Sequence, residues 1–271
     1  MSGFKQYRVP VDGKNFKLRK LDPGDTPFLE DSEPRSRARL EKLANDLDEL
    51  QNKLHAEGRR KVLLVLQGMD TSGKDGTIRW VFSRTSPLGV RVTAFKAPND
   101  IERAHDFLWR CHVVVPAGGQ LMVWNRSHYE DVLVPVVEGW IDKTTTKQRY
   151  AQINDFERLL VETGTVVVKC MLHISKDEQR QRLQDRIDEP DKRWKFSRGD
   201  LDVRAKWMHY QAAYQHLLAA TSTEHAPWHV IPADSKTHRN LMIAQLLVKT
   251  LRDMKLHTPS ADASLDGLVV T

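Results

Sequence analysis

Cysteine is scarce in this chain, and so are long apolar runs. The two cysteines among 271 residues, Cys111 and Cys170, are too few and too isolated for a disulfide framework or a cysteine-based metal site. A reducing cytosol is therefore the expected location, and Cys170, inside a run of strand residues, is expected to be a buried thiol. The N-terminal segment MSGFKQYRVP lacks the apolar core of a secretory signal. No apolar run approaches the length that spans a membrane, and no internal repeat or low-complexity tract is present.

What remains is the composition of a globular protein with an excess of positive charge. The formal net charge is +6 at pH 7. A basic balance favours an anionic partner, such as a nucleotide, polyphosphate or nucleic acid, although an ordinary basic surface would give the same number. The length is sufficient for one large α/β domain with a substantial core.

Apolar segments typical of strands alternate with segments of helical periodicity. We divide the chain into an extended N-terminal arm (1–34), a single domain (35–255) and a flexible tail (256–271). Strands are expected at 62–66, 90–95, 121–124, 166–172 and 229–231, and helices at 35–54, 73–82, 100–111, 128–139, 146–162, from 200 onward and at 236–255. This alternation predicts a parallel sheet with helices on both faces, which binds ligands at the carboxyl ends of its strands.

Two of the expected helices carry apolar stripes. The first stripe has a 3-4-3-4 spacing and consists of Leu40, Leu43, Leu47, Leu50 and Leu54. We interpret this stripe as a surface that packs against the chain's own domain, in preference to the alternative that it forms a contact between subunits. The second stripe consists of Val203, Trp207, Tyr210, Tyr214, Leu217 and Leu218, and it is interpreted as core rather than as a platform for a nucleobase.

The segment GMDTSGKDG, at 68–76, follows the first apolar strand directly. Its frame, Gly68-x4-Gly73-Lys74, is the P-loop pattern, in which glycines let successive backbone N–H groups face an anion. The N-terminus of the next helix points at the same anion, and Lys74 adds a positive charge for the transferring phosphoryl group. The predicted phosphate-binding residues of this segment are Gly68, Thr71, Ser72, Gly73, Asp75 and Gly76. The alternative is a plain glycine turn with a solvated lysine.

Two acidic residues make this P-loop unusual. Asp75 occupies the position after Lys74, where a Ser or Thr usually holds magnesium, and Asp70 lies inside the loop. A carboxylate among bound phosphates repels them unless a cation lies between, so Asp70 is predicted to bind Mg²⁺ or to act as a base. The alternative for Asp70 is a turn-forming residue bonded to its own backbone.

A second polar segment begins where the strand at 121–124 ends. Asn125 comes first and can coordinate or position a ligand without carrying charge. Arg126 is placed to spread positive charge over the oxygens of a transferring phosphoryl group, unless it only forms a structural ion pair with Glu130 or Asp131. Glu130 could instead face an acceptor nucleotide.

A basic stretch lies near 180–200. Arg182 and Arg186 share one face of a helix that Pro190 ends, and Lys192 and Lys195 follow in a loop. We interpret this stretch as a lid that closes over a phosphate chain, with Trp194 and Phe196 as its anchors. The alternative is an exposed basic loop. Together these residues predict a Mg²⁺-dependent kinase that acts on a phosphate-rich substrate.

Six segments in order along the chain resemble the polyphosphate kinase 2 family. They are GMDTSGKDG (68–76), FKAPND (95–100), DFLWRCH (106–112), WNRSHYEDVL (124–133), DEPDKRWKFSRGD (188–200) and PWHVIPADSK (227–236) with Arg239. The form NRSHYED is similar to class III of that family. The resemblance implies a thymidylate-kinase-like P-loop fold with a helical lid, inorganic polyphosphate as donor, and AMP, ADP and ATP as nucleotide substrates of a reversible transfer. It also implies a homo-oligomer, a tetramer or a dimer. With no long apolar run, no membrane partner is expected, and nucleic acid is disfavoured as a partner.

The resemblance also implies roles for residues. Asp70 and Lys74 match the essential acid and lysine of the loop, and Arg126 matches the arginine of the second motif, so these three are the expected catalytic residues. Asn125 and Glu130 are the expected nucleotide-binding residues, and Asn125 replaces an acid of other classes, which leaves the second metal ligand open. The remaining matches are Lys96 and Arg110 as phosphate-binding residues, and Arg182, Arg186, Lys192 and Lys195 in the lid.

Two other functions stay open at this stage. An ATP-dependent nucleotide kinase would usually carry Ser or Thr where this chain has Asp75. A binder of polyphosphate or nucleic acid without catalytic activity would explain the basic balance but not the two acids beside the phosphate loop.

Overall fold

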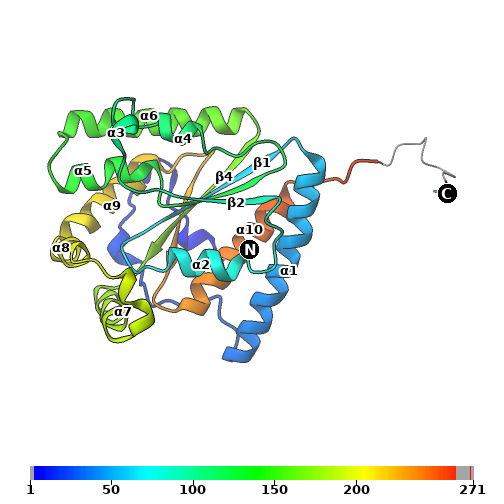
Figure 1. Cartoon of the computed structure of the whole chain (residues 1–271), viewed down its shortest axis with the longest axis horizontal. Helices are drawn as coiled ribbons and strands as arrows, with labels where there is room; N and C mark the ends of the chain where they lie inside the picture. The colour runs from blue at the N-terminus through cyan, green and yellow to red at the C-terminus, as the bar shows by residue number, and fades with distance from the viewer. Residues whose placement is uncertain (1–2, 261–268, 270–271) are drawn as a thin grey trace.

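The computed structural model describes residues 3–260 and 269, and it contains one parallel sheet (Figure 1). The strands lie in the order β2-β3-β1-β4-β5, and each neighbouring pair is parallel. Their bounds are β1 Lys61–Gln67, β2 Val90–Ala94, β3 Leu121–Asn125, β4 Thr165–His173 and β5 Trp228–Pro232. All five predicted strands are confirmed, as is the α/β class.

Helices cover both faces of the sheet, as Figure 1 shows. One face packs against α1, α2 and α10, and the other packs mainly against α6 and α9. The α-helices are α1 Glu33–Glu57, α2 Lys74–Val81, α3 Asp100–Arg103, α4 Trp109–His112, α5 Val134–Val137, α6 Lys143–Glu162, α7 Lys176–Asp188, α8 Gly199–Ala205, α9 Trp207–Thr221 and α10 Lys236–Asp253. The short 3-10 helices are η1 Lys5–Tyr7, η2 Val11–Gly13, η3 Leu18–Lys20, η4 His128–Val132 and η5 Pro190–Lys195.

Both apolar stripes pack inside the chain. Leu40, Leu43, Leu47 and Leu54 of α1 are buried in the core that α1 shares with α10, and Leu50 packs at its edge. The Ser32 side chain caps the first turn of α1, and Gly58 ends the helix in a left-handed conformation that suits glycine. The aromatic stripe of α9 is likewise core, on the opposite face of the sheet.

Two long helices of the prediction are wrong, because local hydrogen bonds and a proline divide them. The segment 100–111 forms α3 and α4 with a turn between them, where the Asp106 carboxylate accepts from the backbone N–H of Leu108. The segment 128–139 forms η4 and then α5. Pro135 has no N–H to continue a helix that arrives from η4, so the chain starts a new turn there.

The N-terminal segment lies against the domain with part of its length buried. Tyr7, Val9 and Leu18 have almost no exposed surface, and the backbone N–H of Leu18 donates to the Gln215 side chain of α9. Of the expected tail, residues 261–268 and 270–271 lie outside the described residues. Both cysteines are free and buried. Among the described residues, no helix has the combined length and apolar character that crossing a bilayer requires.

Candidate active site

The P-loop joins β1 to α2 and requires glycine at two positions. Gly68 and Gly73 have φ angles of 152° and 103°. A Cβ on Gly68 would lie 2.7 Å from the Leu172 carbonyl oxygen, and one on Gly73 would lie 1.9 Å from Nη1 of Arg239. A side chain at Gly68 would therefore clash with the backbone of β4, and one at Gly73 would displace the Arg239 guanidinium. Thr71 also has a positive φ, 63°, which closes the turn before α2.

Lys74 opens α2 with its side chain buried against the loop. Its Nζ donates to the carbonyl oxygens of Gly68 at 2.8 Å and Met69 at 3.2 Å. Burial, aided by the Arg126 charge, lowers the pKa of Lys74 to about 8, although Asp70, Glu130 and Asp75 oppose the shift. Among the residues that the structure describes, no carboxylate forms an ion pair with this ammonium group, so its charge is free to meet a phosphate oxygen.

The two unusual acids of the loop are both held by residues from the end of β3. Oδ1 of Asp70 lies 2.6 Å from Nη2 of Arg126, and Oδ1 of Asp75 accepts a 2.7 Å hydrogen bond from Nδ2 of Asn125. The parallel register places the end of β3 beside the end of β1, which brings these four residues together. Arg126 does not pair with Asp131, whose carboxylate bonds to Arg110 instead.

Glu130, whose charge acts on Arg126, accepts a hydrogen bond from the Gln67 side chain. Burial raises the pKa of Glu130, and the charges of Arg126 and Lys74 oppose that rise. Burial alone would lower the pKa of Arg126, but Glu130 and Asp70 hold it above its ordinary value. Arg126 is therefore charged at every accessible pH. Glu130 does not line the cavity described next.

A cavity of about 590 Å³ opens at the carboxyl ends of the strands. Nine of its lining side chains are basic and four are acidic. Of the predicted site residues, the cavity is lined by Asp70, Thr71, Gly73, Lys74, Asp75, Gly76, Lys96, Asn125, Arg126, Arg182, Arg186, Lys192 and Lys195. Gly68, Ser72, Arg110 and Glu130 lie behind this surface. The P-loop and the basic stretch at 180–200 thus face one shared space.

The four basic residues of the proposed lid differ in their surroundings. Arg182 is 7% exposed and donates to the backbone carbonyls of Thr71, Ser72, Ala233 and Asp234, so it holds the loop. Arg186 lies 3.5 Å from Asp200, and Lys192 lies 2.5 Å from Glu189. The Nζ of Lys195 lies 5.1 Å from the centre of the Trp194 ring.

Trp194 does not anchor this segment. Its side chain is 77% exposed and borders the cavity, which corrects the expectation that it packs against the domain. The prediction failed because an aromatic residue between basic residues has no neighbours in sequence that reveal whether it packs. Pro190 begins η5 directly after α7, as its missing N–H predicts.

The two further basic residues expected to bind phosphate have separate positions. Lys96 lines the cavity. Arg110 is buried, donates to the Lys96 carbonyl oxygen and the Asp131 carboxylate at 2.8 Å each, and lies over the Phe95 ring. In this arrangement its guanidinium orients the loop that presents Lys96.

Four charged residues of the cavity were absent from the predicted site: Asp185, Asp200, Lys236 and Arg239. Arg239 is nearly buried, donates to the Ser72 carbonyl oxygen and fills the space beside Gly73. Burial, with the nearby Arg182 charge, lowers the pKa of Arg239 to about 9. A signal for it existed: an arginine in the first turn of a helix that follows the last strand, at the ligand-binding edge of the sheet.

Comparison with known proteins agrees with this geometry. The sequence model of the family described as Polyphosphate kinase 2 (PPK2) matches residues 30–259. The chain is 48% identical over 266 residues to the AMP/ADP-polyphosphate phosphotransferase of Meiothermus ruber, covering 98% of this chain and 99% of that one. It is 40% identical to the ADP-polyphosphate phosphotransferase of Rhodopseudomonas palustris, covering 94% and 92%.

A solved structure is similar as well. The crystal structure of polyphosphate kinase 2 from Arthrobacter aurescens superposes with a TM-score of 0.92 at 46% identity, covering 97% of this chain and 94% of that chain. The resemblance seen in six segments is confirmed over the whole domain. The chain therefore belongs to the polyphosphate kinase 2 family of phosphotransferases.

Proposed function

We propose that this phosphotransferase moves phosphoryl groups from inorganic polyphosphate to AMP and then to ADP, with Mg²⁺ bound. The observation that carries the proposal is the cavity, which joins the P-loop to the basic stretch and has nine basic side chains in its lining. A linear phosphate chain carries a negative charge on every unit, so it can meet many cations along one path. A relative that this chain matches over nearly its whole length is named AMP/ADP-polyphosphate phosphotransferase, which supports AMP and ADP as the nucleotides here.

The chemistry needs positioning and charge compensation rather than a protein nucleophile. An oxygen of the nucleotide's terminal phosphate attacks the terminal phosphorus of polyphosphate. The bond from that phosphorus to the bridging oxygen breaks, and a polyphosphate one unit shorter leaves. The attacking oxygen is already ionised, so no base has to take a proton. Lys74 and Arg126 face the space where the transferring group would lie and would compensate its charge.

Oxygen donors at the loop fit Mg²⁺. Asp70 and Asp75 each use one carboxylate oxygen in the contacts with Arg126 and Asn125 described above. Among the described residues no group of three or more His, Cys, Asp and Glu side chains is arranged as a metal site. Mg²⁺ commonly binds through one or two carboxylates together with substrate phosphates, which suits this sparse set. When bound, Mg²⁺ would neutralise phosphate charge beside Asp70.

The basic stretch at 180–200 is proposed to close over the donor, because Arg186, Lys192 and Lys195 border the cavity opposite the P-loop. Their partners are carboxylates or an aromatic ring, which phosphate oxygens can replace. Closure would exclude water from the transferring group. The oligomeric state stays a prediction.

The test compares two donors with one acceptor. AMP and Mg²⁺ are incubated with polyphosphate in one reaction and with ATP in the other, and the nucleotides are separated by chromatography. ADP followed by ATP is expected from polyphosphate alone. ADP formed only in the ATP reaction would overturn the proposal in favour of an ordinary nucleotide kinase. The Lys74→Ala variant controls for contaminating kinases in both reactions.

A further inference from the structure

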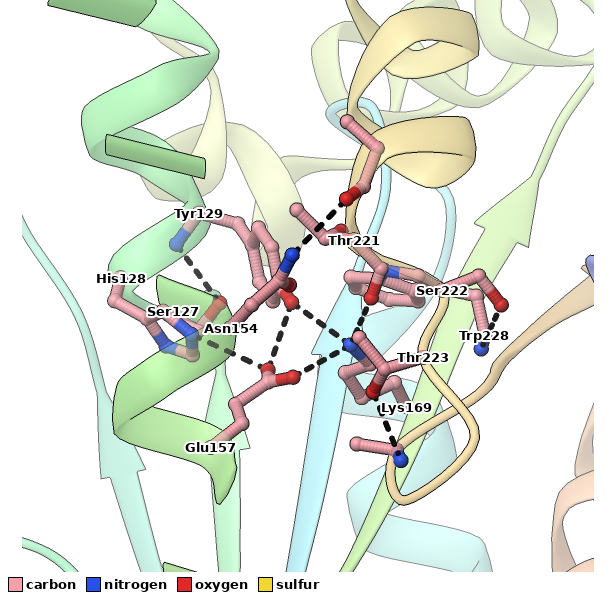
Figure 2. Close-up of polar contacts among 12 residues, drawn as sticks. Ser127, His128, Tyr129, Asn154, Glu157, Lys169, Thr221, Ser222, Thr223 and Trp228 are labelled. Carbon is pink, nitrogen blue, oxygen red and sulfur yellow. Dashed lines mark hydrogen bonds and ion pairs between the residues drawn. The ribbon is translucent and has the colours of Figure 1, made fainter. Parts of the chain in front are cut away.

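A closed polar network lies in the core behind the active site (Figure 2). We call Tyr129, Glu157, Lys169 and Thr221 the buried network. Lys169 of β4 donates to Oε2 of Glu157 at 2.6 Å, to the Tyr129 hydroxyl at 2.9 Å and to the Thr221 carbonyl oxygen at 2.7 Å. The Tyr129 hydroxyl donates to Oε1 of Glu157 at 2.7 Å. The side chains of all four have essentially no exposed surface.

Every strong hydrogen-bonding group of the network has a partner. The three protons of the Lys169 ammonium group meet three acceptors, and both oxygens of Glu157 accept. Nε2 of the buried His128 lies 3.4 Å from Glu157, at the edge of the set. None of these residues lines the cavity, so the transfer reaction described above does not use them directly. Burying a charged pair costs desolvation free energy that an apolar pair would avoid. Stability alone therefore does not explain why Lys169 and Glu157 are present in the core.

The network connects four elements around one segment. Tyr129 belongs to η4, Glu157 to α6, Lys169 to β4 and Thr221 to the end of α9. Figure 2 shows Lys169 between the other three, with η4 on one side and the end of α9 on the other. Because η4 begins two residues after Arg126, the network holds the residues that directly follow this arginine.

Arg126 itself has an unusual backbone. Its φ angle is +61°, a left-handed conformation that is uncommon for residues other than glycine and asparagine. Such a conformation persists when the surrounding structure determines it. On one side the Arg126 N–H donates to the Leu66 carbonyl oxygen at 3.0 Å. On the other side the Ser127 hydroxyl donates to the Gln67 side chain and accepts from the Tyr129 N–H, both at 3.2 Å.

We propose that the buried network positions Arg126 for phosphoryl transfer by holding η4 through the Tyr129 hydroxyl. The residues of the network are positioning residues, because they touch neither substrate nor the reacting atoms. The effect passes from the Tyr129 side chain to the backbone of 126–129, and from there to the guanidinium that contacts Asp70. The proposal rests on the proposed function, because it deepens the role given there to Arg126.

The first experiment removes one hydroxyl. Tyr129→Phe takes a donor from Glu157 and an acceptor from Lys169 while the ring stays in place. A small displacement of a catalytic group can cost up to about a hundredfold in rate, so we expect kcat to fall by about tenfold or more with the KM for polyphosphate within about twofold. Tyr150→Phe is the matched control, since Tyr150 lies in α6, is also buried and is outside the network. A kcat equal to that of this control would overturn the proposal, even if the melting temperature fell.

The second experiment tests whether the effect passes through Arg126. Tyr129→Phe is measured again in the Arg126→Lys background. If Tyr129 acts through the placement of the guanidinium, the second substitution should change kcat by less than about twofold there, because linked residues are not additive. The same fold loss in both backgrounds would overturn the proposal. Wild-type transfer from polyphosphate is measured alongside, so failure of the proposed function is seen separately.

A third variant tests the proposal without leaving an unpaired charge in the core that could unfold the protein. Lys169→Met combined with Glu157→Leu replaces the ion pair by apolar groups of similar size, a change that folded proteins often tolerate. It leaves the Tyr129 hydroxyl without both partners, and we expect the same loss of kcat at unchanged KM. A stable double variant with wild-type kcat would show that the network is only structural.

Discussion

The two most buried lysines near the sheet, Lys74 in the P-loop and Lys169 in the buried network, have opposite surroundings. Lys169 has three hydrogen-bond acceptors, one of them a carboxylate at 2.6 Å. Among the described residues, Lys74 has only two backbone carbonyls as acceptors. Burial lowers the pKa of both lysines, that of Lys74 to about 8, so the contrast lies in their partners. The charge of Lys169 is therefore neutralised by Glu157 within the protein, whereas the charge of Lys74 can bind an anionic ligand. The same residue type stabilises structure in one region and binds ligand in the other.

The first prediction separates the two lysines by activity. Lys74→Ala should lower kcat by about a thousandfold, because loss of one preorganised positive group at the transferring phosphoryl costs that much, and it should leave the fold intact. Steady-state kinetics and circular dichroism measure the two effects. Lys53→Ala, on the exposed side of α1, is the control. A rate near that of the wild type would remove the P-loop assignment and the comparison with it.

The second prediction concerns stability. Lys169→Met should lower the free energy of unfolding by about 3 kcal/mol, because Glu157 would remain buried without its ion-pair partner. Urea unfolding measures the difference, and Lys53→Met controls for the loss of a lysine charge. The double replacement with Glu157→Leu should recover most of the loss. If Lys169→Met alone were as stable as the wild type, the ion pair between Lys169 and Glu157 would not contribute as the structure indicates.

The third prediction concerns Asp70, the acid inside the P-loop that pairs with Arg126. Asp70→Asn should lower kcat by about a hundredfold, because one oxygen donor for Mg²⁺ and the pairing with Arg126 are both weakened. Extra Mg²⁺ should not restore the rate. Asp191→Asn, in the exposed part of η5, is the control. Full activity of Asp70→Asn would make Asp70 a turn residue with no part in transfer.

The fourth prediction tests whether Lys192 and Lys195 of the basic stretch bind an anionic ligand, as is proposed for Lys74. Lys192→Ala combined with Lys195→Ala should raise the KM for polyphosphate by about tenfold and the KM for AMP much less, since each exposed ionic contact contributes up to about 1 kcal/mol. Lys42→Ala with Lys53→Ala makes the same charge change on the exposed face of α1. Equal effects on both substrates would argue against a donor-specific lid.

The fifth and smallest effect is a pH dependence. Because the pKa of Lys74 is lowered, the ammonium form is complete well below pH 8 and is lost as the pH rises through about 8. Phosphate binding needs that form, so the Kd for polyphosphate should rise about fourfold between pH 7 and pH 8.5, as the protonated fraction falls. Lys74→Arg should bind with little pH dependence in this range. A flat profile for the wild type would contradict the proposed state of Lys74.

The comparison of the two lysines also shows what the sequence could reveal. The P-loop is local in sequence: strand, glycines, lysine and helix follow one another, so Lys74 and its neighbours could be predicted. The five strands were equally accessible, because each is a short apolar run. The hydrogen bonds of the buried network join residues between 12 and 52 positions apart, and no local pattern links them. Lys169 within the run Val166–Leu172 was the one visible sign, a charge at a position that a central strand buries.

The role of Arg182 was hidden for the same reason. Its helical spacing with Arg186 suggested two similar cations, but Arg182 contacts the P-loop and the segment after β5, which only the folded chain brings near. Pro135 shows the reverse case. A proline in the interior of the helix predicted at 128–139 removes a backbone N–H, so the sequence alone already indicated the break there.

The contacts of Arg182 have a mechanical consequence for lid closure. This guanidinium fastens the middle of α7 to carbonyl groups of the P-loop and of the segment after β5. We therefore expect the first half of α7 and the phosphate loop to move together. For the lid closure proposed above, we expect the hinge to lie beyond that point, toward Pro190, where α7 ends. The segment that carries Lys192 and Lys195 beyond this point is short, so its proposed movement over the cavity would leave the contacts between Arg182 and the phosphate loop in place.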